Sequence, residues 1–126
     1  MKKTICYFAL LLLSIFFVAC NRFDNYGYPS KITFGREGGT RTCEGEHTFY
    51  HVDISDYNGN DENTITEGEN DTIVVTKDWL SVKYRVGRDY DVKIIASPNT
   101  TGKKRSLYVS GMVDNSFADI KVTQNR

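Results

Sequence analysis

Hydrophobic and polar positions alternate with a period of two over the second half of the chain. In four segments the apolar residues keep one parity: Leu80, Val82, Tyr84 and Val86; Val92, Ile94 and Ala96; Leu107 and Val109; Ala118, Ile120 and Val122. Successive side chains of a strand point to opposite faces, so this alternation is typical of strands with one buried face. We therefore predict strands over residues 79–86, 91–96, 107–112 and 118–124, with the apolar parity in the core.

The first half of the chain shows shorter versions of the same pattern. Ile32 and Phe34 alternate with polar neighbours up to Gly38-Gly39, whose paired glycines supply the positive φ angles that a tight turn needs. Further strands are expected over residues 40–44, over 48–54, where Tyr50, Val52 and Ile54 share a parity, and over 72–76. No window of twelve residues carries a helical stripe. Seven or eight short strands predict an immunoglobulin-like antiparallel β-sandwich.

The N-terminus has the pattern of an export signal. Lys2 and Lys3 precede an apolar stretch over residues 5–19, which ends at Ala19-Cys20. Ala before Cys resembles the lipobox of bacterial lipoproteins, which implies cleavage after Ala19 and lipidation of Cys20. The alternative is an ordinary secretory signal with an incidental cysteine. We predict a lipoprotein signal peptide over 1–19, a lipidated cysteine and tether over 20–30, and one domain over 31–126.

The cysteines agree with an exported lipoprotein. If Cys6 leaves with the signal and Cys20 carries lipid, Cys43 remains alone and forms no internal disulfide. Its neighbours Glu44 and Glu46 would raise rather than lower a thiol pKa. A shielded strand residue is therefore favoured over a catalytic nucleophile.

Charge excludes some partners. The chain has 16 basic and 16 acidic residues, and without Lys2 and Lys3 it would have 14 and 16. A protein that binds nucleic acid needs a basic excess to neutralise phosphates, so no nucleic-acid partner is expected. The charges are nevertheless segregated, because residues 53–71 hold seven acidic side chains and no Lys or Arg.

The sequence offers little support for catalysis. His47 and His51 would lie about 13 Å apart on a strand, too far to share one metal ion. No nucleophile elbow, phosphate loop or histidine-carboxylate zinc motif occurs in the chain. We predict that the protein is not an enzyme.

The acidic segment has two interpretations. Asp56, Asn58, Asn60 and Glu67 fall at positions 1, 3, 5 and 12 of an EF-hand-like count, which would suit calcium. The alternative is a solvated loop, because the sixth position is Asp61 rather than Gly. Close by, Asp71-Thr72-Ile73 resembles the O-glycosylation sequon of exported Bacteroidetes proteins, which marks Thr72.

Four short motifs occur in a characteristic order. They are Ile32-Thr33-Phe34 before Gly38-Gly39; Asp78-Trp79-Leu80-Ser81-Val82; Asp91-Val92-Lys93-Ile94 before Ser97-Pro98-Asn99-Thr100-Thr101-Gly102-Lys103-Lys104-Arg105; and Ile120-Lys121-Val122-Thr123-Gln124. Together they resemble the BACON domain, a β-sandwich of Bacteroidetes lipoproteins and glycan-degrading enzymes. The resemblance implies a non-catalytic, carbohydrate-binding lipoprotein of the outer membrane, on its surface or its periplasmic side. A protein-interaction component of the cell envelope is the alternative, and a passive spacer is a third.

Strand parity also points to a candidate ligand face. Lys83 and Arg85 should point outward on one strand, and Lys93 and Tyr108 on the strands that follow. If consecutive strands are neighbours, Tyr108 lies beside Lys93 and Lys83, where a ring with basic companions suits a neutral or acidic sugar. Trp79 is either a plug at the edge of the core or a further stacking platform.

Overall fold

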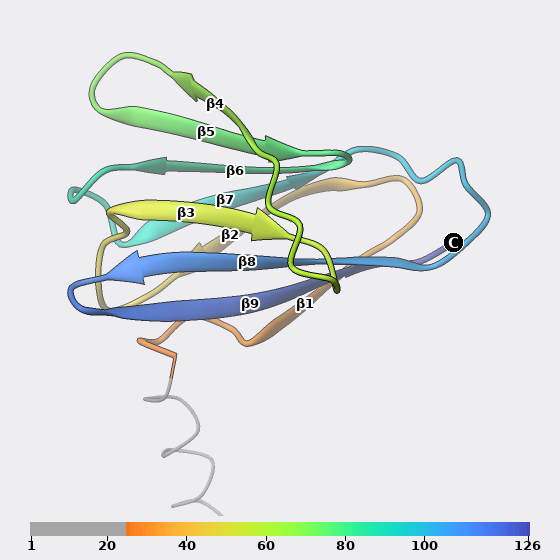
Figure 1. Cartoon of the computed structure of the whole chain (residues 1–126), viewed down its shortest axis with the longest axis horizontal. Coiled ribbons are helices and arrows are strands. Elements are labelled where there is room, and N and C mark those ends of the chain that lie inside the picture. Colours follow the sequence, from red (N-terminus) through yellow and green to blue (C-terminus); the bar gives the residue numbers. More distant parts are fainter. Residues whose placement is uncertain (1–24) are drawn as a thin grey trace, which may run out of the picture.

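The computed structural model describes residues 25–126, and within this range the chain is built from strands without a helix (Figure 1). The strands are β1 (Lys31–Phe34), β2 (Gly39–Glu44), β3 (His51–Ser55), β4 (Thr64–Glu67), β5 (Thr72–Lys77), β6 (Leu80–Arg85), β7 (Asp91–Ala96), β8 (Arg105–Val113) and β9 (Ser116–Gln124). Accordingly, residues 25–126 contain no helix long and apolar enough to cross a membrane.

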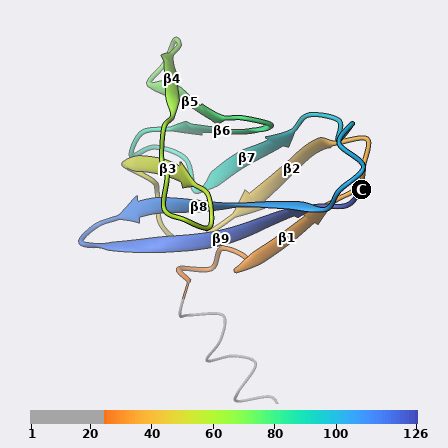
Figure 2. The same ribbon diagram turned by 45° about the vertical axis from the view of Figure 1, so that its right-hand side comes forward.

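The strands form two sheets that pack face to face. One sheet has the order β1-β9-β8-β3 and the other has the order β2-β7-β6-β5-β4, and the two layers are visible in both views (Figures 1 and 2). The predicted β-sandwich is therefore confirmed. One pairing departs from the antiparallel prediction, because β1 lies parallel to β9, with Lys31 opposite Lys121.

The shared core contains the residues that the period-two pattern predicts. Leu80, Val82 and Ile94 from the five-stranded sheet are fully buried. Val109, Ile120 and Val122 from the other sheet are buried opposite them. The alternating exposed residues, such as Lys83 and Lys121, face solvent. Each sheet therefore buries one face and leaves the other available for contacts.

Two details of the first half of the chain differ from the predictions. Strand β3 begins at His51 rather than at residue 48, and Phe49 is buried while Tyr50 is 48% exposed. The Phe49 ring fits above Gly111 of β8, where a Cβ atom would come within 2.5 Å of the ring. The alternation of buried and exposed residues therefore does not extend before β3. The Phe49 ring is buried there and the Tyr50 ring is exposed.

Strand β4 was not predicted. All four of its residues are exposed, so it has no apolar parity that could mark it as a strand. It forms by pairing with β5, with Ile65 opposite Val75 and Glu67 opposite Ile73. The β4–β5 hairpin stands out from the rest of the sandwich (Figure 2).

The folded domain starts before the predicted boundary at residue 31. Tyr28 belongs to the core, with 4% of its surface exposed, and its hydroxyl lies within hydrogen-bond distance of the carbonyls of His47 and Tyr90. The predicted tether over 20–30 is therefore wrong for residues 25–30. The signal peptide, Cys20 and the start of the tether lie outside the described residues. Both sheets and their core lie within residues 25–126, so this range contains the contacts that a sandwich requires.

Buried polar side chains fix the β1–β2 and β7–β8 connections in place. The Gln124 carboxamide donates to the carbonyls of Gly35 and Ser97 and accepts from Arg105 Nε at 2.8 Å. Asn99 is buried in the β7–β8 connection, where its carboxamide donates to Lys103 O and accepts from the Thr101 hydroxyl. Asn99 thus has a structural role in this loop.

Candidate functional site

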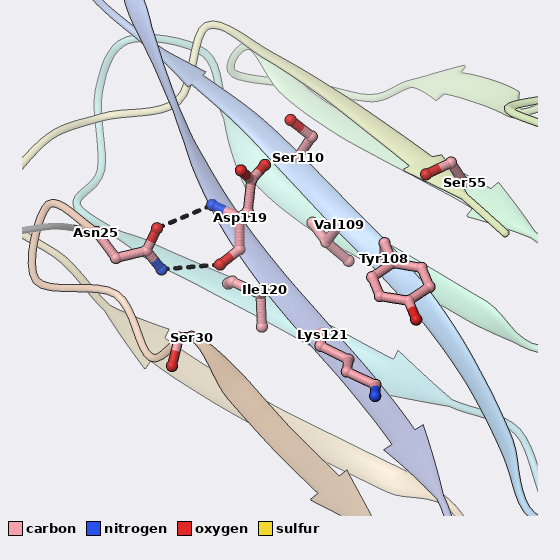
Figure 3. Close-up of a pocket in the computed structure, with 9 residues that line it drawn as sticks. All are labelled: Asn25, Ser30, Ser55, Tyr108, Val109, Ser110, Asp119, Ile120 and Lys121. Atoms are coloured by element: carbon pink, nitrogen blue, oxygen red, sulfur yellow. Dashed lines mark hydrogen bonds between the residues drawn. The ribbon is translucent and has the colours of Figure 1, made fainter. Parts of the chain in front are cut away.

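The outer face of the four-stranded sheet carries an open hollow of about 850 Å³. Figure 3 shows the residues that line it, which come from β3, β8, β9 and the segment before β1. Seven of the nine lining residues carry a polar group on the side chain. The residues used below are Asn25, Ser55, Tyr108, Ser110, Asp119 and Lys121.

Strand register places these side chains in two rows. Tyr108 on β8 lies between Ser55 on β3 and Lys121 on β9. In the next row on the same face, Ser110 is opposite Asp119. Because residues two apart on a strand share a face, the two rows are neighbours. One face of the sheet therefore carries an aromatic ring flanked by a hydroxyl and an ammonium group, with a further hydroxyl and a carboxylate in the next row (Figure 3).

Asn25 closes one side of the hollow. Its carboxamide donates to Asp119 O at 2.9 Å and accepts from Asp119 N at 2.9 Å, as the dashed lines in Figure 3 show. This two-point contact extends the hydrogen bonding of β9 beyond β1. It also fixes the segment before β1 against the sheet, so that this wall of the hollow is formed before any ligand binds.

The groups around Tyr108 retain hydrogen-bonding capacity. Lys121 Nζ lies 6.0 Å from the centre of the Tyr108 ring, at the outer limit of a cation–π contact. The hydroxyl-bearing residues Ser55, Tyr108 and Ser110 line the hollow beside Lys121. The hollow can therefore offer an apolar ring together with several donors and acceptors to one ligand.

The predicted cluster of Tyr108 with Lys83 and Lys93 is not formed. Lys83 on β6 is directly opposite Lys93 on β7, so these two lysines do meet as predicted. Both strands belong to the five-stranded sheet, whereas β8 belongs to the other one. The outward residues of the two sheets face opposite sides of the sandwich, because the chain crosses between sheets after β7.

Arg85 and Trp79 are both engaged elsewhere. Arg85 donates from Nε to Asn70 O at 3.1 Å and approaches Asp89 Oδ2 at 3.5 Å. The Trp79 ring packs against the edge of the core, and the Arg105 guanidinium lies 4.7 Å from its centre. Trp79 therefore matches the predicted core-edge plug rather than a free stacking platform.

The acidic segment does not form the predicted EF-hand-like loop. Its last four positions, including Glu67, form β4. Asp56 Oδ1 accepts from the amides of Asn58 and Asn60, and Asp56 Oδ2 accepts from Asn60 Nδ2 at 3.0 Å. These hydrogen bonds, the Asn60 side chain first, hold the pKa of Asp56 below its ordinary value of 3.8. The carboxylate thus organises a turn, and within residues 25–126 no group of three or more His, Cys, Asp or Glu side chains could hold a metal ion.

The remaining candidate residues are placed as follows. Cys43 is buried on β2, and burial raises the pKa of its thiol, in agreement with a shielded strand residue. His51 Nε2 lies 3.1 Å from Asp53 Oδ1 on the same exposed face of β3. Thr72 opens β5 opposite Arg85, and its glycosylation stays a prediction.

Sequence reasoning missed the companions of Tyr108 in the hollow. Lys121 and Asp119 alternate with the buried Ile120 and Val122, so their outward orientation could have been predicted from the period-two pattern. The short turn at Asp114 and Asn115 joins β8 and β9 as a hairpin with Val113 opposite Ser116. Counting residues back along both strands from that turn pairs Tyr108 with Lys121. The turn in the sequence is therefore the feature from which this site could have been predicted.

Comparisons with known proteins relate the chain to two solved structures. No protein-family model and no curated protein matches it. The Bacteroides ovatus GH5 xyloglucanase in complex with a XXXG heptasaccharide is similar over 76% of this chain at 18% identity and a TM-score of 0.51, and the match spans 17% of that chain. A protein from Bacteroides thetaiotaomicron solved by NMR is similar over 78% of this chain and 81% of its own, at 20% identity and a TM-score of 0.46. The likeness to the xyloglucanase concerns the fold alone.

Proposed function

We propose that the protein is a non-catalytic saccharide-binding lipoprotein and that the hollow around Tyr108 is its binding face. The observation that carries this proposal is the Tyr108 ring, bordered by the Ser55 and Ser110 hydroxyls and by Lys121. Sugar rings stack their C–H faces on aromatic rings, while their hydroxyls exchange hydrogen bonds with hydroxyl, amide and charged groups. The hollow combines these two kinds of contact.

The shape of the hollow suits part of an extended chain. It is open to solvent on a sheet face, and its volume of about 850 Å³ exceeds what one sugar unit would occupy. Lys121 lies beside the ring and the oppositely charged Asp119 lies in the next row, so the face suits either a neutral oligosaccharide or one with a carboxylate directed to Lys121. We propose binding without hydrolysis.

Calorimetric titration tests this proposal. The XXXG heptasaccharide serves as the neutral probe and tetragalacturonate as the acidic probe, each added to a soluble form of residues 21–126. At least one should bind saturably, and Tyr108→Ala should weaken that binding by about tenfold or more, since 1.4 kcal/mol of lost contact corresponds to a factor of ten. Tyr108→Phe keeps the ring and should retain most of the affinity.

A matched control separates the hollow from general surface effects. Tyr57 is 87% exposed in the turn after β3 and outside the hollow, so Tyr57→Ala should bind like the parent. Equal affinities for the parent and Tyr108→Ala would remove the hollow as the site. If neither probe binds, the saccharide function fails for these two classes of glycan.

We further propose that the domain belongs with BACON-like modules on an outer-membrane lipoprotein anchored through Cys20. The support is the sequence pattern around Ala19-Cys20 together with the order of the four motifs in the domain. Because the anchor would depend on one thiol, Cys20→Ser should move the protein from the membrane fraction to the soluble fraction of fractionated cells. An unchanged distribution would contradict lipidation at Cys20.

A second candidate function, protein interaction, is favoured by the edge strand β4. It is the last strand of the five-stranded sheet, and its residue Ile65 is 54% exposed. An exposed edge strand can add a strand from another protein. Ile65→Lys should abolish such pairing, and cross-linking in intact cells would show whether the partner is lost. Domain stability and saccharide affinity should stay unchanged in urea unfolding and calorimetric titration.

A further inference from the structure

Within residues 25–126, each of the two sheets ends at two edge strands. These are β1 and β3 in the four-stranded sheet and β2 and β4 in the five-stranded sheet. The outer side of an edge strand presents backbone N–H and C=O groups to which another chain can add a strand, and proteins usually cover such edges. The edges of this domain differ in how far side chains cover them.

Side chains cover parts of the β3, β1 and β2 edges. At β3 the Asn63 carboxamide accepts from Ile54 N and donates to Ile54 O, both at 2.8 Å, as a neighbouring strand would. On the other side of the sandwich, Arg41 of β2 donates to Thr33 O of β1 at 3.2 Å, which links these two edges. An added strand would have to displace these contacts.

The β4 edge is exposed. Strand β4 pairs with β5 on one side and ends the five-stranded sheet on the other. All four of its residues are exposed, and the β4–β5 hairpin stands out from the sandwich in Figure 2. A strand from another chain can therefore approach β4 without rearranging the core.

The register of the hairpin determines which backbone groups of β4 point outward. Gly68 N donates to Thr72 O at 2.8 Å, so the chain has a hydrogen-bonded position there. Such positions alternate along an antiparallel pair, so the backbone groups of Thr66 also face β5. The N–H and C=O groups of Ile65 and Glu67 therefore point to the exposed edge.

The side chains at this edge combine one apolar residue with negative charge. Ile65 is 54% exposed, although it lies opposite the buried Val75 of β5. Glu67 shares the face of Ile65, because it lies two residues further along the strand. Residues 61–71 contain no Lys or Arg and five acidic residues, which are Asp61, Glu62, Glu67, Glu69 and Asp71.

We propose that the β4 edge binds an extended segment of another protein in which an apolar residue lies between basic residues spaced two positions away. The inference rests on the interaction function proposed for β4 and specifies the chemistry of its partner. The added strand pairs with the outward backbone groups of Ile65 and Glu67, covers the Ile65 side chain and places Lys or Arg opposite Glu67. Opposite charges on neighbouring strands stabilise their pairing.

The same charges disfavour a second copy of this chain as the occupant. Two β4 strands paired edge to edge would bring together two copies of the segment 61–71, each with five acidic side chains. Like charges on paired strands are destabilising. The partner is therefore a different chain that carries the opposite charge.

Hydrogen exchange of the ¹⁵N-labelled, soluble form of residues 21–126 tests this inference. The probe is the acetylated and amidated peptide Lys-Thr-Lys-Thr-Val-Thr-Lys-Thr-Lys, whose sequence is the same in both directions. It should bind saturably, with a dissociation constant on the order of 0.1–1 mM. At saturation the amides of Ile65 and Glu67 should exchange at least fivefold more slowly, and the amide of Thr66 should change less because it already faces β5.

A second peptide and three variants assign the binding to the edge and to its charge. The peptide with Glu in place of every Lys should bind at least fivefold more weakly, and about 0.5 M NaCl should reduce this difference, since salt screens exposed charges. Ile65→Pro removes an outward N–H without removing a donor to β5, and it should abolish the protection of Glu67. Glu67→Lys should weaken binding at least fivefold. Glu37→Lys makes the same charge change in the exposed β1–β2 turn and should bind like the parent.

The outcomes separate this inference from the proposed functions. Equal protection by both peptides would leave β4 as an interaction edge and overturn its preference for a basic partner. Protection by neither peptide would overturn the interaction function together with this inference. Parent-like protection in Ile65→Pro would also overturn the inference, because the peptide would then bind elsewhere. Tyr108→Ala should bind the basic peptide like the parent, since Tyr108 belongs to the other sheet.

Discussion

Removing the Tyr28 hydroxyl should destabilise the domain, although Tyr28 precedes the first strand. The Tyr28 phenol donates to His47 O and also approaches Tyr90 O, at 2.8 Å. Tyr90 O keeps a second donor, Gly45 N at 2.9 Å. In Tyr28→Phe it is therefore His47 O that loses its hydrogen-bond donor. Loss of a typical hydrogen bond costs about 0.5–1.5 kcal/mol, and we expect about 1 kcal/mol here, because the contact with His47 O is part-buried and Tyr90 O retains a partner.

Tyr28→Ala should cost more, because the ring is also lost. The ring centre lies 4.6 Å from that of Phe49, and Gly45 leaves room for it, since a Cβ at Gly45 would come within 2.1 Å of Tyr28 Cε2. Truncation of a buried aromatic side chain costs about 3–5 kcal/mol. The order of stability should therefore be parent, then Tyr28→Phe, then Tyr28→Ala.

Urea denaturation and thermal unfolding measure these differences. For a domain of this size each 1 kcal/mol lowers Tm by about 4–8 °C. Burial raises the pKa of Tyr28 from 10.0 to about 12, so the phenol contributes fully below pH 10 and the contribution is lost as the pH rises towards 12. Tyr28→Phe lacks this loss, and Tyr57→Phe, at an 87% exposed side chain, should behave like the parent. Parent-like midpoints for both Tyr28 variants would show that this segment is a loose tether.

Three further predictions concern packing, strand parity and the Asp56 turn. Gly111→Ala should cost about 1–3 kcal/mol in urea unfolding, because its Cβ would overlap the buried Phe49 ring at 2.5 Å; a parent-like midpoint would contradict that packing. Leu80→Ala should cost roughly 2–5 kcal/mol and Lys83→Ala less than about 0.5 kcal/mol, and equal effects would refute the predicted parity. Since the folded pKa of Asp56 is lowered, its contribution is present above its ordinary value of 3.8 and lost as the pH falls below it. The stability difference between the parent and Asp56→Asn should therefore shrink in acid, and a difference that grows there would be inconsistent with this assignment.

The fold was predictable for strands that have one face buried and the other exposed to solvent. In such strands the period-two pattern identifies the core residues, as it does for Leu80, Ile94 and Ile120. Strand β4 was not predictable, because it lies beyond the core and both of its faces are exposed. Tyr28 was missed for a related reason, since a single buried residue among turn-forming neighbours has no period.

The candidate site was predictable in part. Parity correctly predicts that Tyr108 and Lys83 leave the core, but parity carries no information on which sheet a strand joins. The rule that consecutive strands are neighbours holds for β6 and β7, which pair, and fails at the crossover to β8. Tyr50 was predicted to share the parity of Val52 and Ile54, but it precedes β3 and is exposed, because Phe49 is buried in its place.

Mapping saccharide binding onto the domain tests the central proposal most directly. The measurement is a ¹H–¹⁵N spectrum of the labelled domain during titration with whichever of the two oligosaccharide probes binds in calorimetry. Saturable shifts are expected for amides around the hollow, at Ser55, Tyr108, Ser110, Asp119 and Lys121. Saturable shifts confined to the opposite sheet face, around Lys83 and Lys93, or the absence of any shift in the hollow, would contradict it.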